Sequence, residues 1–190
     1  VYKMRRDPER RVRLEAVKTL SLLDDREGWS EMEQLVRESS TGIEVRSAII
    51  EQLLTHRGRQ SSETVEALID EEWDKENSRI LDTIGRVISR AGEGHDRNVI
   101  ERLLNHPNFI IRIYAIRAIG NNDIASLGDS LAEYSGEGTN RALRSAALRA
   151  MEQLGIDPDA VAPDGADGED ESDRENVREE DASDEGAESS

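Results

Sequence analysis

Basic side chains recur at one position of a repeating pattern, and their type suits them to bind carboxylates or phosphates. A planar guanidinium can donate two parallel hydrogen bonds to such a group. The series stands about 32 residues apart and consists of Lys18, Arg86, Arg117 and Arg149, with Tyr114 nearby and Glu51 at the remaining place. These residues predict a surface for an anionic or carboxylate-rich partner. The alternative interpretation is that arginine, a good helix former, simply fills a solvated helix face.

Residues that support catalysis in other proteins show no such arrangement in this sequence. His56, His95 and His106 are not followed by glutamate, and no two of them have ligand spacing on one helix face. The serines have no activating base in view, and the chain contains no cysteine. We therefore expect no catalytic residue, no metal site and no cofactor.

Five segments with a shared apolar pattern must position the basic series. Apolar residues recur at offsets 0, 4, 5 and 8 of each segment, which places them on one face of a helix. The segments begin at Val12, Val45, Ile80, Ile111 and Leu143. The basic series stands at offset 6, almost opposite the apolar stripe, and is therefore predicted to point away from the core.

Shorter amphipathic segments lie between these five and predict a partner helix for each of the last four. The recurring helices are predicted at 8–23, 44–57, 78–90, 109–119 and 141–154, and their partners at 29–38, 62–74, 96–105 and 123–134. Asp96 and Asp123 suit the N-caps of two partner helices. No segment alternates strictly, so the chain is predicted to be all-α. About five helical hairpins should stack, because one unit alone cannot bury its apolar face.

The two predicted sets of helices differ in charge. The partner helices contain 14 acidic and three basic residues over their predicted spans. The recurring helices contain 14 basic and six acidic residues. The partner helices are therefore acidic as a set and the recurring helices basic.

The recurring segments resemble the second helix of HEAT repeats, and they are most similar to the short variety named after phycobilisome bilin lyases. The strings are Val12-Arg13-Leu14-Glu15-Ala16-Val17, Val45-Arg46-Ser47-Ala48-Ile49-Ile50, Ile111-Arg112-Ile113-Tyr114-Ala115-Ile116 and Leu143-Arg144-Ser145-Ala146-Ala147-Leu148. Asp7-Pro8 matches the Asp-Pro turn of the family. The resemblance implies a right-handed α-solenoid whose second helices line a concave face. With the charges of the two sets of helices, it also implies an acidic outer face and a basic inner face.

The resemblance also implies a structural ladder, in which the turn aspartate is hydrogen-bonded to the arginine at offset 1. The ladder residues would be Asp7, Arg13, Arg46, Arg112 and Arg144. Only the first unit keeps the aspartate, since Ser40, His106 and Gly138 stand at the equivalent places. Leu81 replaces the arginine in the third unit.

The chain changes character near residue 157. Of the formal net charge of -17, residues 157–190 contribute -13, from 15 acids and two arginines, and residues 1–156 contribute -4. The last 34 residues contain no Leu, Ile, Phe, Trp or Tyr, so they cannot bury enough apolar surface to offset their chain entropy. We therefore predict an α-solenoid over 1–156 and a disordered acidic tail over 157–190. Solubility is the favoured role for this tail, and partner binding is the alternative.

The composition also bears on the cellular setting. Many acids with only three lysines against 22 arginines are typical of a cytosolic protein from a halophilic archaeon. Salt there would screen bulk charge and weaken any inference from net acidity alone. No apolar run approaches a membrane span, and no signal peptide is recognisable, so we expect a cytoplasmic protein. Val1 in place of an initiator methionine fits a truncated chain, whose solenoid would continue upstream, or an alternative start codon.

The function expected from these features is that of a non-catalytic scaffold or adaptor, which binds another protein on the concave face of a HEAT solenoid. The protein's own acidic tail is a candidate occupant of the same surface. Two alternatives stay open: a bilin-lyase-like enzyme accessory and a nucleic-acid-binding HEAT module. The net negative charge makes nucleic acid the less favoured partner, because phosphate binding requires a concentrated positive field.

Overall fold

The computed structural model describes residues 1–23, 26–90 and 96–158, and within these ranges the chain is helical and contains no strand, as predicted. The α-helices are α1 (Arg10–Leu23), α2 (Arg26–Arg37), α3 (Ile43–His56), α4 (Ser62–Glu72), α5 (Arg79–Ile88), α6 (Arg97–Leu104), α7 (Phe109–Asn121), α8 (Ala132–Ser135) and α9 (Arg141–Leu154). Short 3₁₀ helices are η1 (Tyr2–Arg6), η2 (Gly58–Ser61), η3 (Ala125–Leu127) and η4 (Asp129–Leu131). His95 and tail residues 159–190 lie outside the described ranges.

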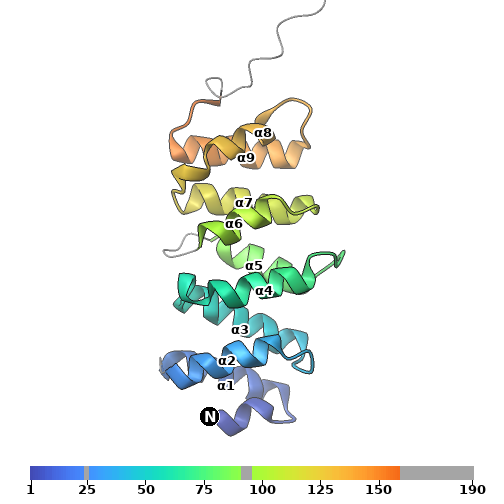
Figure 1. Cartoon of the computed structure of the whole chain (residues 1–190), viewed down its shortest axis with the longest axis vertical. Coiled ribbons are helices and arrows are strands. Elements are labelled where there is room, and N and C mark those ends of the chain that lie inside the picture. Colours follow the sequence, from blue (N-terminus) through green and yellow to red (C-terminus); the bar gives the residue numbers. More distant parts are fainter. Residues whose placement is uncertain (24–25, 91–95, 159–190) are drawn as a thin grey trace, which may run out of the picture.

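The helices follow one another along a single long axis and form two layers (Figure 1). Helices α1, α3, α5, α7 and α9 pack against one another in chain order, and we call them the odd-helix layer. Helices α2, α4, α6 and α8 lie on the other side and form the even-helix layer. Each even helix also packs against the odd helix that follows it, so the chain alternates between the layers.

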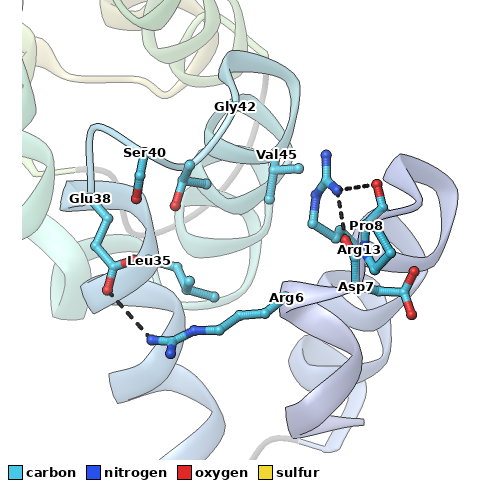
Figure 2. Close-up of a pocket in the computed structure, with 10 residues that line it drawn as sticks. Arg6, Asp7, Pro8, Arg13, Leu35, Glu38, Ser40, Gly42 and Val45 are labelled. Carbon is cyan, nitrogen blue, oxygen red and sulfur yellow. Dashed lines mark hydrogen bonds and ion pairs between the residues drawn. The ribbon is translucent and has the colours of Figure 1, made fainter.

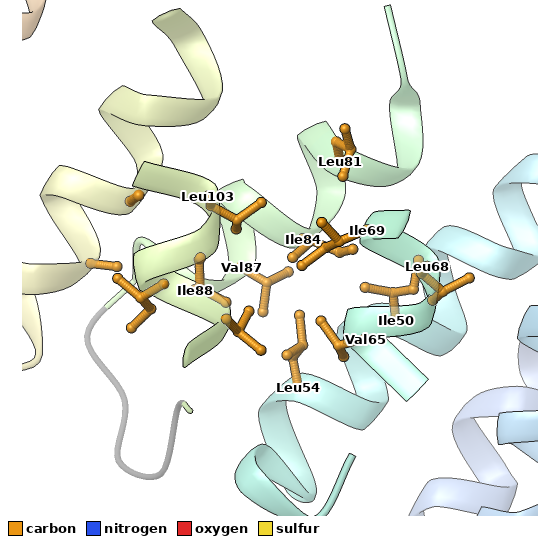
Figure 3. Close-up of a cluster of buried hydrophobic side chains, with 14 of the residues drawn as sticks. Ile50, Leu54, Val65, Leu68, Ile69, Leu81, Ile84, Val87, Ile88 and Leu103 are labelled. Atoms are coloured by element: carbon orange, nitrogen blue, oxygen red, sulfur yellow. The ribbon is translucent and has the colours of Figure 1, made fainter. Parts of the chain in front are cut away.

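The core is the apolar seam between the two layers (Figure 3). Side chains from α3, α4, α5 and α6 meet in one continuous cluster, where Ile50, Ile69 and Ile84 are fully buried. The apolar stripe predicted from the sequence forms this seam, and only its members Val12 and Leu148 remain partly exposed. Burial of a large aliphatic side chain stabilises a fold by about 1.5–3 kcal/mol. Each odd helix therefore keeps its apolar stripe in the seam, and the opposite side of the helix faces outward.

Polar residues determine where four of the helices begin. The side chains of Ser78, Asp96, Asn108 and Asn140 accept hydrogen bonds from the free amides of the first turns of α5, α6, α7 and α9. The capping role predicted for Asp96 is thus confirmed. At the other end of α9, Gly155 adopts a left-handed conformation with φ of 68°, which glycine allows at little cost.

The continuous helix predicted over 123–134 is wrong. This segment forms η3, η4 and the single turn α8, and Asp123 has a φ of 53° in place of a capping conformation. Its Ser, Gly and Asp residues favour turns over helix interiors. Gly128 also lies so close to Ile156 that a Cβ there would stand 2.4 Å from the Ile156 Cδ1 atom. At the start of the chain, η1 occupies a stretch for which no helix was predicted.

None of the described helices combines the length and the apolar character that a membrane span requires.

Candidate partner-binding surface

The basic series at offset 6 lies on the outer surface of the odd-helix layer. Arg86 on α5, Arg117 on α7 and Arg149 on α9 are exposed, as is Lys18 on α1. Helices α5, α7 and α9 are consecutive neighbours, so their three arginines occupy three adjacent helices. We call Arg86, Arg117 and Arg149 the arginine row.

Contacts between equivalent positions set the register of these three helices. The side-chain amide of Asn121 donates to the carbonyl oxygen of Ser89 at 2.6 Å, and that of Gln153 donates to Asn121 Oδ1 at 3.1 Å. Each pair is 32 residues apart, and successive members of the arginine row are 31 and 32 residues apart. The row therefore crosses the helices nearly at right angles to their axes. Packed helices lie about 8–10 Å apart, which gives the spacing between the points where the arginines attach.

The ion pairing of the offset-6 residues differs along the stack. Toward the N-terminus, Lys18 pairs with Glu15 at 2.9 Å, and Glu51 pairs with Arg90 at 3.3 Å. Within the described part of the chain, no ion pair joins a carboxylate to any member of the arginine row. Within this series, the positive charge that is not paired with a described carboxylate therefore lies on α5, α7 and α9.

Tyr114 lies beside this row and is partly buried. Its hydroxyl donates to the Asp82 carboxylate at 3.1 Å, and its ring covers Gly85, where a Cβ would stand only 2.5 Å from ring atom Cδ2. Burial raises the pKa of Tyr114 above its usual range, and the hydrogen bond to Asp82 raises it further. The positive charges of Arg86 and Arg117 act in the opposite direction on the pKa. Tyr114 thus offers a neutral aromatic ring beside the arginine row.

The charge difference between the two layers survives when the observed bounds are used. The five odd helices contain 12 basic and five acidic residues, whereas α2, α4, α6 and α8 contain four basic and ten acidic residues. An anionic ligand is therefore attracted to the odd-helix layer in preference to the even-helix layer.

The arginines at offset 1 have a different environment from the arginine row. Arg13 donates through Nη1 to the carbonyl oxygens of Asp7 at 2.7 Å and Pro8 at 2.9 Å (Figure 2). The Asp7 carboxylate instead accepts a hydrogen bond from the Glu9 amide at 2.8 Å. In the first unit, the expected ladder arginine therefore binds the main chain of the turn, and the aspartate side chain accepts from the Glu9 amide just before α1.

Arg46 shows most clearly what the offset-1 position does. This residue is only 7% exposed, and its Nε donates to the Val36 carbonyl oxygen of α2 at 2.8 Å. Its Nη atoms lie 3.3 Å from the Glu71 carboxylate and 3.9 Å from that of Glu72, both on α4. One guanidinium thus joins α2, α3 and α4, which belong to two successive hairpins.

The last two ladder residues contact their neighbours in other ways. The Nε of Arg144 donates to the carbonyl oxygen of Ser135 at 3.0 Å. The guanidinium carbon of Arg112 lies 6.0 Å from the centre of the Tyr134 ring. Arg13, Arg46 and Arg144 therefore donate to main-chain carbonyl oxygens of the fold, and Arg112 contacts a ring. In the described part of the chain, the side chains of the arginine row make no hydrogen bond or ion pair of this kind.

Hollows occur at several places on the described surface. One of about 550 Å³ lies at the edge where the α2–α3 loop faces the turn before α1, and Arg6, Arg13 and Glu38 line it (Figure 2). A hollow of about 240 Å³ lies between the loops that precede α5 and α7. Another, of about 390 Å³, lies on α9 and includes Arg149, so it adjoins the end of the arginine row.

The two described histidines each lie beside a tryptophan. His106 is only 3% exposed, its Nε2 lies 3.1 Å from the Trp73 carbonyl oxygen, and its Nδ1 accepts from the Asn108 amide at 3.0 Å. Burial lowers the pKa of His106, which agrees with a neutral ring that uses both nitrogens. His56 lies beside Trp29, with ring centres 6.4 Å apart. Among the described residues, no group of three or more His, Asp or Glu side chains is placed to hold a metal ion.

The sequence does not match any protein-family model or any curated protein with which it was compared. The geometry of the odd-helix layer is therefore the basis on which a function can be assigned.

Proposed function

We propose that the chain is a right-handed α-solenoid of HEAT-like hairpins and that it acts in the cytoplasm as a non-catalytic scaffold. In this proposal a carboxylate-rich segment of a partner protein binds across the odd-helix layer, which is the concave face. The observation that carries the proposal is the arginine row, with three exposed guanidinium groups on adjacent helices and no ion pair to a described carboxylate.

The chemistry of the row supports a carboxylate ligand. A guanidinium can bind a carboxylate through two parallel hydrogen bonds, and the adjacent Tyr114 ring adds apolar contact area. One exposed ion pair contributes only about 0.2–1 kcal/mol, so a single pair would not hold a partner. Three pairs on one rigid surface act together, because the packed helices hold the row in place before the ligand arrives.

The proposal can be tested with two triple variants of the full chain that change the net charge equally. One carries Arg86→Glu, Arg117→Glu and Arg149→Glu. The other reverses three exposed arginines at or near the starts of even helices, where acidic residues suit the helix dipole: Arg26, Arg59 and Arg97.

Each immobilised protein is incubated with cell extract, and bound proteins are identified and quantified by mass spectrometry. We expect one stoichiometric protein to be retained by the wild type and by the even-helix variant but lost from the row variant. Equal retention by both variants would refute the proposal. Recovery of nucleic acid in place of protein, in a salt-dependent manner and only with an intact row, would support the nucleic-acid-binding alternative.

A further inference from the structure

The acidic residues of the C-terminal segment have a period of three. From Asp164 to Glu188, every third position is acidic at seven of nine places, the exceptions being Asn176 and Ala182. Both arginines of the segment, Arg174 and Arg178, lie outside this series. The series begins with four aspartates in succession: Asp164, Asp167, Asp170 and Asp173.

This period matches the spacing of the arginine row. A polyproline-type extended chain has three residues per turn and rises about 3.1 Å per residue, so every third side chain points the same way at intervals of about 9.3 Å. Neighbouring helix axes in the odd-helix layer should lie about 8–10 Å apart. An extended strand that crosses α5, α7 and α9 can therefore place one aspartate at each arginine.

The position of the segment allows it to reach the row without help from another molecule. The chain leaves the described structure at Pro158, just beyond the end of α9, and Asp164 follows six residues later. Six extended residues span roughly 19 Å, whereas the helix from Arg149 to Leu154 is only about 8 Å long. The hollow that includes Arg149 lies at this end of the row. From there, the next members of the arginine row are Arg117 and then Arg86.

We propose that residues 164–173 bind across the arginine row of the same molecule, with Asp164, Asp167 and Asp170 at Arg149, Arg117 and Arg86 in that order. This inference rests on the proposed function, because it uses the same surface. It also specifies the ligand class: an extended acidic segment with carboxylates at every third residue. A partner of that kind has to displace the chain's own segment before it can bind, so the segment reduces the affinity for weaker ligands.

The test uses the full chain, whose lack of cysteine allows a single spin label at Ser172→Cys. Paramagnetic broadening is then measured on the side-chain Nε–H signals of the arginines by NMR at low salt. We expect the signals of Arg86, Arg117 and Arg149 to lose intensity. The signal of Arg97, on the even helix α6, should not change.

Two quadruple variants separate spacing from net charge, since each removes four negative charges. One carries Asp164→Asn, Asp167→Asn, Asp170→Asn and Asp173→Asn. The other carries Glu169→Gln, Glu171→Gln, Glu175→Gln and Glu180→Gln, all outside the period-three series. The first should restore the Arg86 signal, and the second should leave it broadened.

Equal effects of the two quadruple variants, or equal broadening of Arg86 and Arg97, would overturn the inference. Arg86 is the decisive reporter because, of the three, it lies on the helix farthest from the start of the segment. The scaffold proposal has a separate readout in partner retention. If Arg86 is not broadened while retention still depends on the row, the tail inference alone fails. If the tail binds the row but retention does not depend on the row, the scaffold proposal alone fails.

Discussion

Replacement of Arg46 by leucine tests how much the bridge between successive hairpins contributes to stability. The Arg46 guanidinium binds the Val36 carbonyl oxygen and reaches Glu71 and Glu72, so it connects three helices. The fold already contains leucine at the equivalent place of α5, where Leu81 is 1% exposed. An apolar side chain therefore fits this position, and the Arg46→Leu variant should fold.

The expected loss of stability can be worked out from the partners left behind. The Val36 carbonyl oxygen loses a buried donor, which costs about 1–3 kcal/mol. Glu71 is 41% exposed, so its ion pair contributes only about 0.2–1 kcal/mol. Glu72 keeps Lys75 and Ser78, each at 2.7 Å, and its charge remains compensated. We expect a net loss of about 2–3 kcal/mol, which corresponds to a decrease in Tm of about 5–10 °C in a chain of this size.

Urea unfolding monitored by tryptophan fluorescence and by circular dichroism measures this loss. The two tryptophans report on the region around Arg46, because Trp29 lies on α2 and Trp73 follows α4. Arg144→Leu is the matched control: its Nε bonds one carbonyl oxygen, of Ser135, so about 1 kcal/mol should be lost. If Arg46→Leu is no less stable than Arg144→Leu, the bridge does not stabilise the stack. Buried ionic groups can be replaced without loss when both partners become apolar, but here the carboxylates remain.

Two further predictions concern a glycine at a close helix contact and a buried histidine. Gly120→Ala should destabilise the chain by about 1 kcal/mol despite the higher helix propensity of alanine, because its Cβ would stand 2.9 Å from Ala150 Cα. A Cβ added at Gly138 would have no neighbouring atom within 4 Å, so Gly138→Ala should leave the Tm nearly unchanged when both variants are compared by thermal unfolding. Because burial lowers the pKa of His106, the unfolded chain binds a proton first as the pH falls. The free energy of unfolding should therefore decrease below a pH of about 6.5, and His106→Gln should remove that part of the decrease, as measured by urea titrations at several pH values.

The recurring helices could be predicted well because their burial follows from local periodicity. The predicted span 141–154 is identical to that of α9, and 44–57 differs from α3 by one residue at each end. Apolar residues repeated every three or four positions fix one face of a helix whatever the neighbours are. The same reasoning predicted a helix over 123–134 that the structure does not contain. Leu127 and Leu131 are buried four residues apart, as in an α-helix, but they lie on two short 3₁₀ helices. Periodicity alone does not distinguish these turns from an α-helix.

The contacts between hairpins could not be predicted, since they depend on the register between units. Glu71 and Glu72 follow Arg46 by 25 and 26 residues, and nothing local marks them as its partners among the many acids of α4. The Tyr114–Asp82 hydrogen bond likewise spans 32 residues. The offset-6 series was recognised from sequence, but only the structure shows that Lys18 is paired with Glu15 and that the arginine row is not.

The two sets of arginines lie at different angles around their helices, and this difference accounts for their different environments. Offset 1 lies about 100° from offset 0, inside the arc that the core buries, whereas offset 6 lies about 240° away and faces solvent. Arg46 at offset 1 is desolvated, and its guanidinium binds a carbonyl oxygen and a carboxylate of the fold. A guanidinium at offset 6 stays hydrated and needs no internal partner, as Arg117 shows. In the proposed function, partner binding therefore depends on the set that contributes least to folding. We expect that reversing the charges of the arginine row abolishes partner retention and leaves the free energy of unfolding nearly unchanged.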